Sequence, residues 1–376
     1  MTNRERLQRT LEGKPVDRPP VCFYEINGYD QDVDDPDEFN IFNDPSWKPL
    51  VELATNGTDR IVLNRIPAVR KETRLFETES FTDENGSAHT IQTLKANGRM
   101  LTKRSRRDRD VFTTWTTEHL LKTPEDALAY LSIKTDGKII EPDFSGFLRC
   151  ERALGETGLA AFDTCDAICA VASLFSMEDY LVTALTEKAL FAKMLEREHE
   201  RVKERLTAVS KAHPGRMYRI YGPEYASPPY LPPELFEEYV VRYDRELIDI
   251  IHASGGFARI HSHGNLSLII GKIAAMGADG LDPIEPPPQG DMELSDLRRE
   301  YGRDVALFGN IELSEIETLE REAFENRVRR ALAEGMEGPG RGFVLMPSAC
   351  PIGRKLSDKT LKNYETMARL AKETFY

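Results

Sequence analysis

The sequence has no long hydrophobic run and no surplus of basic residues. No apolar stretch in its 376 residues approaches the roughly 18 residues that a membrane-spanning helix needs. The charged start, residues 1–14, is not typical of a secretory signal. A formal net charge of −13 disfavours binding to a nucleic-acid backbone. We therefore expect a cytoplasmic protein whose partners include neither membranes nor nucleic acids.

Cysteines are few and odd in number, and repeats are absent. Five cysteines indicate reduced thiols rather than a disulfide framework. We find no internal repeat and no low-complexity tract, which disfavours solenoids. Gly335, Gly338 and Gly340 come before the last predicted strand, whereas a dinucleotide-binding fingerprint follows a strand. The composition, with 40% hydrophobic and 30% charged residues, is that of an ordinary globular protein.

Short apolar runs separated by helical patterns make up most of the chain. Such alternation predicts a parallel sheet covered by helices. Because eight βα units close into a barrel, we predict an α/β fold, a (β/α)8 TIM barrel that forms a single domain over residues 1–376. The eight predicted strands are residues 21–24, 60–64, 159–162, 217–221, 257–260, 280–281, 305–308 and 343–346.

A large insertion, residues 66–157, separates the second and third predicted strands. Alternating residues over 70–105, broken by 84–86 and 96–98, predict antiparallel hairpins. A helix is expected to open at residue 123, where a cap, a proline and early acids agree.

A basic cluster, residues 103–109, lies within this insertion and has no interleaved aromatic residues. We interpret it as a solvated hairpin edge, where positive charge discourages edge pairing. The alternative is a docking place for an anionic cofactor or partner.

In such barrels the chemistry lies where the strands end. Imidazole, thiolate and carboxylate groups at these ends make up a zinc ligand set. His261 and His263 point the same way on an extended strand, although a turn at Ser262 would leave only one facing a metal. The strand ends carry Glu25, Asp163, Tyr221, Glu224, Tyr225, His261, His263, Asp282, Glu285, Asn310, Glu312 and Cys350.

Some of these residues, and most of the cysteines, are better explained by a structural role than by catalysis or metal binding. Asp282 or Glu285, taken alone, is typical of a hydrogen-bonded cap. Free cysteines are commonly packing residues, which is what we expect of Cys22, Cys150, Cys165 and Cys169.

Several short motifs spread along nearly the whole chain are recognisable: Arg4-Glu5-Arg6 with Asp17-Arg18-Pro19-Pro20, Ser227-Pro228-Pro229, His261-Ser262-His263-Gly264, Met276-Gly277-Ala278-Asp279-Gly280, Tyr301-Gly302 and Gly309-Asn310-Ile311-Glu312. In these motifs the chain resembles the uroporphyrinogen decarboxylase (URO-D) superfamily, and this resemblance implies a (β/α)8 barrel.

One branch of that superfamily, the decarboxylases proper, binds a tetrapyrrole with many carboxylates through an arginine-rich segment after the first strand. Here the corresponding residues 23–29 contain no arginine and include Glu25. A polyanion would be bound unfavourably there. Decarboxylation of that substrate is therefore disfavoured.

The other branch, the zinc-dependent corrinoid methyltransferases, resembles this chain in its metal-site pattern. Proteins like methylcobalamin:coenzyme M methyltransferase have a His-x-Cys pair after strand five and a distant cysteine after strand eight. The resemblance implies His261, His263 and Cys350 as metal ligands, with Glu224 as a fourth. His263 replaces the cysteine of the pair, and a set richer in nitrogen and oxygen is less selective for zinc over other divalent metals.

The resemblance thus implies a metal (zinc)-dependent methyltransferase or demethylase that transfers a methyl group between a small substrate or thiol acceptor and a corrinoid. We expect the corrinoid on a partner protein, with a homodimer left open. Asp163, Tyr221 and Glu224 are the candidate catalytic residues, and Asn310 and Tyr225 the candidate cofactor-binding residues.

Two alternatives remain. One is a metal-free decarboxylase in which Asp163 and Glu25 transfer protons. The other is a non-catalytic corrinoid carrier, which is disfavoured because the Asp-x-His-x-x-Gly cobalt-binding pattern is absent.

Overall fold

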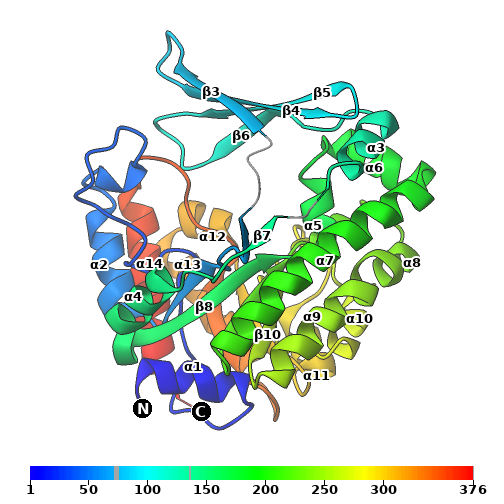
Figure 1. The fold of residues 1–376 in the computed structure, drawn as a ribbon. Coiled ribbons are helices and arrows are strands. Elements are labelled where there is room, and N and C mark those ends of the chain that lie inside the picture. The colour runs from blue at the N-terminus through cyan, green and yellow to red at the C-terminus, as the bar shows by residue number, and fades with distance from the viewer. Residues whose placement is uncertain (72–75, 135–136, 376) are drawn as a thin grey trace.

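A computed structural model describes residues 1–71, 76–134 and 137–375 of the chain. A parallel sheet curls around the centre, helices pack on its outer side, and a second, antiparallel sheet lies above it (Figure 1). The fold is α/β and TIM-like, as the alternation of apolar runs predicts.

Among the described residues the parallel sheet has seven strands, each hydrogen-bonded to the next. They overlap seven of the eight predicted runs, and β8 and β12 each end three residues beyond the predicted end. In spatial order they are β1 (Arg60–Arg65), β8 (Gly158–Cys165), β9 (Met217–Tyr221), β10 (Phe257–His261), β11 (Gly280–Asp282), β12 (Ala306–Ile311) and β13 (Phe343–Pro347).

The predicted first strand, residues 21–24, is not a strand. Val21 forms a single parallel bridge with Leu345 of β13, and the N–H of Asp59 donates to the Val21 carbonyl at 2.7 Å. This segment therefore lies between the two edge strands. Pro20 has no N–H to donate, which shortens the possible ladder. The prediction of eight strands in a closed barrel is wrong in this respect.

Helices cover the outside of the curled sheet, and α1 lies across the end where the strands begin (Figure 1). The helix that starts at Pro233 changes to π geometry over one turn before it continues as α9. The helices are α1 (Asn3–Leu11), α2 (Lys48–Gly57), α3 (Pro124–Leu131), α4 (Ser145–Leu154), α5 (Ala167–Ala172), α6 (Met177–Thr186), α7 (Lys188–Ala212), α8 (Pro233–Phe236), the π-helix η4 (Glu237–Val241), α9 (Arg242–Ala253), α10 (Ile270–Ala275), α11 (Leu294–Tyr301), α12 (Leu313–Thr318), α13 (Arg321–Gly335) and α14 (Asp358–Glu373), with short 3-10 turns η1 (Ile41–Asn43), η2 (Gly155–Thr157) and η3 (Pro223–Ala226).

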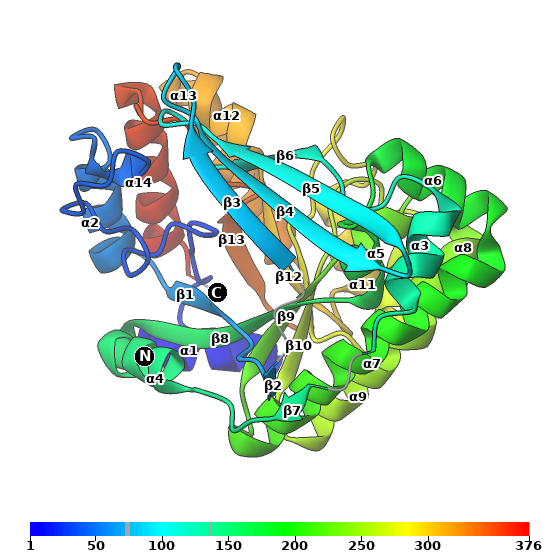
Figure 2. The ribbon, with the colours of Figure 1, turned by 45° about the horizontal axis from the view of Figure 1, so that its top comes forward.

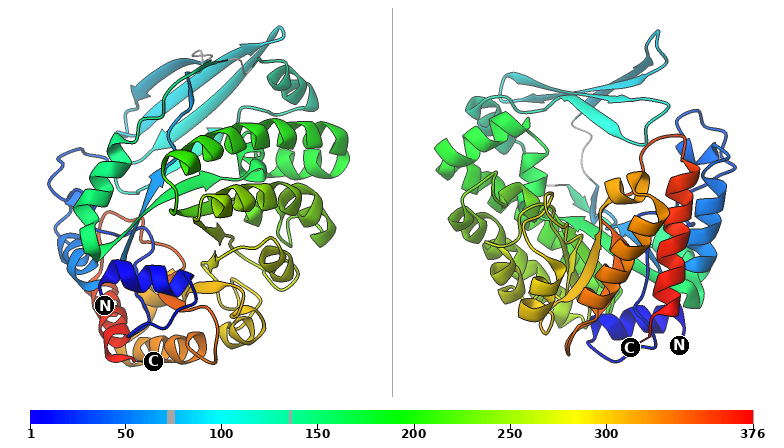
Figure 3. Two further views of the ribbon diagram at one scale, coloured as in Figure 1. Left: turned by 60° about the horizontal axis from the view of Figure 1, so that its bottom comes forward. Right: turned by 180° about the vertical axis from the view of Figure 1, so that it is seen from behind.

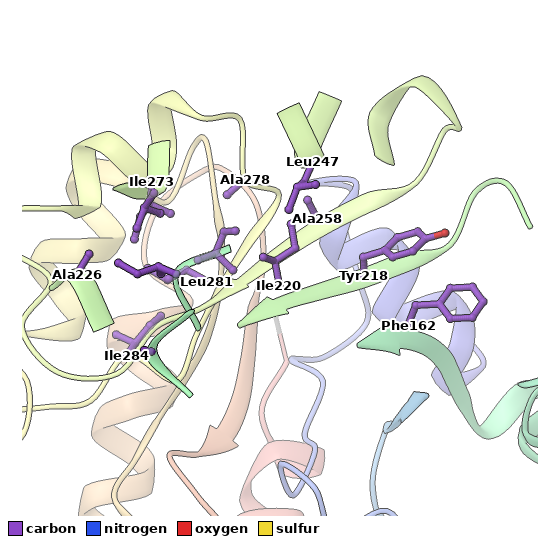
Figure 4. Packing of buried hydrophobic residues seen from close by; sticks show 14 of the residues in the cluster. Phe162, Tyr218, Ile220, Ala226, Leu247, Ala258, Ile273, Ala278, Leu281 and Ile284 are labelled. Carbon is purple, nitrogen blue, oxygen red and sulfur yellow. The ribbon is translucent and has the colours of Figure 1, made fainter. Parts of the chain in front are cut away.

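Two apolar clusters hold the sheet in place. Alternate strand residues point outward to the helices, as Phe162, Tyr218 and Ile220 do in Figure 4. The others point inward, where residues such as Met217 and Phe308 pack with helix α1. These inward residues come from near the start of most strands, so the polar side chains of the inner face lie nearer the strand ends.

The insertion over 66–157 lies between β1 and β8, as predicted, and contains an antiparallel sheet. The Asn97-Gly98 turn, with both φ angles positive, joins its central strands β4 and β5. Residues 72–75 of the predicted hairpin region lie outside the described residues. The four strands, in order, are β3 (Phe76–Thr82), β4 (Ala88–Ala96), β5 (Arg99–Arg107) and β6 (Thr114–Glu118), and β2 (Arg70–Lys71) pairs separately with β7 (Lys138–Ile139).

The basic cluster is not at an edge. Residues 103–107 lie in β5, an inner strand of the antiparallel sheet, and 108–109 follow directly, so the prediction that they form a hairpin edge is wrong. The four described arginines of the cluster each have a partner: Arg104 pairs with Glu118, Arg106 with Asp108, Arg107 with the Phe39 carbonyl and Arg109 with Glu38. These contacts leave little support for an anion-docking role.

No helix in the described part of the chain is long and apolar enough to cross a bilayer.

Candidate active site

The inner face of the curled sheet becomes charged where the strands end. Parallel pairing places Asp163 beside Arg219, Arg219 beside Arg259, and His261 beside Asp282. Residues paired in this way point to the same face of a sheet. Charged side chains from four consecutive strands therefore meet inside the sheet, at the end where TIM-barrel chemistry is found.

Arg219 is the centre of the first group of contacts. Its guanidinium forms two hydrogen bonds with the Asp163 carboxylate, of 2.7 and 3.1 Å, and one of 3.2 Å with Glu25. It also donates to the Tyr24 hydroxyl at 3.3 Å. Burial lowers the pKa of Arg219, but the hydrogen bonds and charge of Asp163 raise it by more, so the pKa lies above its usual value. Asp163, a predicted catalytic residue, is thus held in an ion pair.

His261 belongs to a second group of contacts deeper in the sheet. Its Nδ1 lies 2.7 Å from Oδ2 of Asp282, whose other oxygen lies 2.9 Å from Nε of Arg259. Burial raises the pKa of Asp282, yet Arg259 and His261 lower it overall to about 2. An ionised carboxylate only accepts hydrogen bonds, so Nδ1 of His261 carries a proton. The Tyr24 hydroxyl lies 3.5 Å from Nε2.

His263, just beyond β10, is held in the same manner. Its Nδ1 lies 2.8 Å from Oε1 of Glu285, and the N–H of Gly264 donates to the other carboxylate oxygen at 2.7 Å. Burial lowers the pKa of His263, but Glu285 and neighbouring carboxylates raise it above its usual value. The His261 and His263 rings lie 4.7 Å apart between centroids, so the intervening turn does not separate them.

The two imidazoles have the arrangement that metal-binding histidines use, with Nδ1 on a carboxylate and Nε2 turned elsewhere. Within residues 1–71, 76–134 and 137–375, however, no group of three or more histidine, cysteine, aspartate or glutamate side chains is placed to hold a metal ion. As they lie, these residues do not form a complete metal site. The metal remains a prediction.

The other two predicted ligands have different surroundings. Glu224, in η3, accepts a hydrogen bond of 3.1 Å from the Gly222 N–H and raises the pKa of His263 by its charge. Cys350 lies beyond β13, and burial, with the charge of Glu25, raises the pKa of its thiol to about 12. A thiol with this pKa is protonated at neutral pH unless a cation lowers the pKa.

The remaining predicted residues lie at the strand ends. Tyr221 ends β9, with the Arg219 guanidinium 5.7 Å from its ring centre. Asn310 is buried in β12, and its side-chain oxygen accepts a hydrogen bond of 3.2 Å from Arg327. Tyr225 packs edge-on against Tyr180. The structure therefore places all the predicted residues near strand ends.

Sequence reasoning missed the buried arginines and the roles of their partners. Arg219 and Arg259 are charged residues inside otherwise apolar strands, and this was the available signal. Asp282 and Glu285, interpreted as simple caps, instead orient the two histidines. Tyr24, with a φ of 53°, turns its side chain into the site from a backbone conformation that is uncommon outside glycine.

Solved structures that resemble this one include two enzymes. A methyltransferase from Methanosarcina mazei is 16% identical, with a TM-score of 0.62, and the match covers 99% of this chain and 99% of that chain. At this identity the similarity shows the fold alone. D-psicose 3-epimerase from Clostridium cellulolyticum H10 is 11% identical over 60% of this chain and 82% of that chain, with a TM-score of 0.37 that supports no argument.

Sequence comparison gives the family. No curated protein matches the chain. A family model described as uroporphyrinogen decarboxylase (URO-D) matches residues 160–373, which is more than half of the chain and includes β9 to β13 with their charged ends. The chain therefore belongs to the uroporphyrinogen decarboxylase (URO-D) family.

Proposed function

We propose that this protein is a methyltransferase or demethylase that moves a methyl group between a small substrate or thiol acceptor and a corrinoid on a partner protein. The proposal includes a divalent metal, with zinc as the first candidate. The observation that carries it is the pair of adjacent imidazoles whose Nδ1 atoms are both held by carboxylates. Similarity of fold to a methyltransferase over nearly the whole chain supports the same choice.

The surroundings of Arg219 favour this function over decarboxylation of a polyanion. The guanidinium contacts the Tyr24 hydroxyl, but it is already bound to Asp163 and Glu25. A substrate carboxylate would have to displace one of these internal partners. The same ion pairs weaken the alternative in which Asp163 and Glu25 transfer protons, because Arg219 occupies oxygens of both carboxylates.

The side chains present can orient a small substrate without further rearrangement. Tyr24 and Tyr221 flank the Arg219 guanidinium, with ring centres 5.8 and 5.7 Å from it, which fixes both rings. Their positions are set by the buried ion pairs rather than by mobile surface groups. Such pre-positioned groups reduce the entropy cost of aligning a methyl group with its acceptor.

Elemental analysis of the purified protein tests the metal. We expect about one equivalent of a divalent ion per chain in the wild type, and a loss of most of it in His263→Ala and Cys350→Ala. His89→Ala, on the antiparallel sheet, and Cys150→Ala, in the core, are the matched controls and should keep the ion. A metal-free wild-type protein would contradict this part of the proposal.

Methyl transfer itself is tested by incubating the protein with methylcobalamin and a panel of small thiols, and following the corrinoid spectrum. We expect demethylation of the corrinoid that depends on protein and thiol, and that decreases at least tenfold in His261→Ala, since the oriented imidazole is lost. Release of carbon dioxide from small acids, unaffected by chelators, would instead favour the decarboxylase alternative.

A further inference from the structure

The antiparallel sheet lies across the end of the curled sheet that carries the charged residues. Figures 2 and 3 show strands β3–β6 spanning this end from the side of α3 to the side of α2 and α14. Its contacts with the rest of the chain are concentrated at two places. One involves Leu121, which pairs with the segment after α5, and the other Val111, which pairs with Gly353 after β13.

The attachment near α3 is apolar. Leu94 and Leu101, opposite each other on β4 and β5, are each 1% exposed and belong to the main hydrophobic core. Leu120 and Leu121, which follow β6, are buried in the same core, and the Leu121 N–H donates to the Leu174 carbonyl at 2.9 Å. Separating this end would expose several large side chains to water, which is costly.

The attachment near α2 is mainly polar and centres on Arg354. Its guanidinium donates to the carbonyl of Arg109, at 2.6 and 3.0 Å, in the turn between β5 and β6. The same group donates to the carbonyls of Glu38 and Asn40, and to the Asn43 side chain at 2.9 Å. One side chain thus joins three segments: the antiparallel sheet, the loop before η1, and the segment after Cys350.

Neighbouring contacts at this end are also mostly polar. The Phe39 carbonyl accepts a hydrogen bond of 2.9 Å from Arg107 of β5, and Glu38 pairs with Arg109. The main apolar contribution is Phe112, whose ring lies 4.9 Å from that of Phe42 but which is 43% exposed. When a hydrogen bond near the surface breaks, water replaces the lost partner, so the net cost in free energy is small. The attachment near α2 is therefore easier to open than the apolar attachment near α3.

We propose that Arg354 is a positioning residue that holds the antiparallel sheet closed over the site, and that the sheet opens at this polar end while it stays anchored at the apolar end. Local opening of a protein starts where buried apolar contacts are few. In this proposal the opening admits the partner protein that carries the corrinoid, and that role rests on the proposed function. The opening itself does not.

Alkylation of the full-length protein by iodoacetamide, resolved by peptide mass spectrometry, tests this. Cys350 reports on the site because it lies two residues before Ile352, whose carbonyl accepts a 2.7 Å hydrogen bond from Phe112. Arg354→Ala is expected to speed alkylation of Cys350 on the order of tenfold, because several hydrogen bonds are lost. Arg107→Ala, made on the sheet side, is expected to speed it several-fold.

Internal and matched controls separate opening of the sheet from general weakening of the fold. Cys22 and Cys150, which are buried in the core, should keep their wild-type rates in both variants. Arg104→Ala, on the same strand but paired with Glu118 within the sheet, should leave Cys350 unchanged.

Hydrogen exchange of residues 108–113 should increase in Arg354→Ala and Arg107→Ala alone. Unchanged Cys350 alkylation in Arg107→Ala, or an equal rise at all five cysteines, would overturn the proposal. Neither readout needs methyl transfer, so the proposal and the proposed function can fail separately.

Discussion

Replacing Arg259 by methionine is expected to lower the free energy of unfolding by about 3–5 kcal/mol at neutral pH. Arg259 is 2% exposed, and Asp282, its partner at 2.9 Å, is fully buried. Methionine fills a similar volume but leaves the Asp282 carboxylate without its cation. An uncompensated buried charge, rather than the lost attraction alone, is the source of this large effect.

The pH dependence and a double variant check this cause. In the wild type the pKa of Asp282 is lowered to about 2, so its ion pair stabilises the fold above about pH 4, and this contribution is lost as pH falls through about 2. The Arg259→Met defect should therefore shrink in acid, where Asp282 is protonated. Adding Asp282→Asn should restore part of the stability in urea unfolding at pH 7. Arg245→Met, on the exposed side of α9, is the control and should change little.

The seven strands that the sequence predicts correctly share a physical origin. Most are apolar runs buried on both faces, and β1 is buried over its first three residues; such runs stand out from the amphipathic helices between them. The segment around Val21 has the same apolar pattern but forms only one bridge. The apolar pattern predicts that the segment is buried. It does not predict that Pro20 and the turn at Tyr24 limit the backbone hydrogen bonds that the segment can form with its neighbours.

The site was predictable in position but not in its connections. Strand ends can be found from the sequence, and Asp163, Tyr221 and His261 do lie at the ends of β8, β9 and β10. Which carboxylate orients which imidazole depends on the register between strands far apart in sequence, as with His261 and Asp282 of β11. The sequence pattern also cannot tell whether Cys350 approaches the histidines, because a long loop carries it.

The second large effect on stability is expected from a pair of buried acids. Asp166, which caps α5, and Asp244, on α9, are each 1% exposed. In the described part of the chain, neither oxygen of Asp244 and only one of Asp166 has a hydrogen-bond partner. Burial, followed by the charge of Glu224, raises the pKa of Asp244 to about 8. Burial and the charge of Asp244 also raise the pKa of Asp166.

These shifts make the fold less stable as pH rises. In the unfolded chain Asp244 loses its proton near pH 4, whereas in the folded protein it keeps the proton up to about pH 8. Between these values the folded state binds more protons, so the stability falls with increasing pH. The penalty is absent below about pH 4, grows through this window and is complete above about pH 8.

Asp244→Asn should remove this penalty, because asparagine has nearly the same shape and no charge to bury. At pH 8.5 we expect its melting temperature to exceed that of the wild type by roughly 5 °C or more, since each pKa unit is worth about 1.4 kcal/mol. The difference should shrink toward zero near pH 4.5. Asp249→Asn, exposed on the same helix, should show no such trend. A difference between Asp244→Asn and wild type that stays constant from pH 4.5 to 8.5 would mean that Asp244 is ionised in the folded protein.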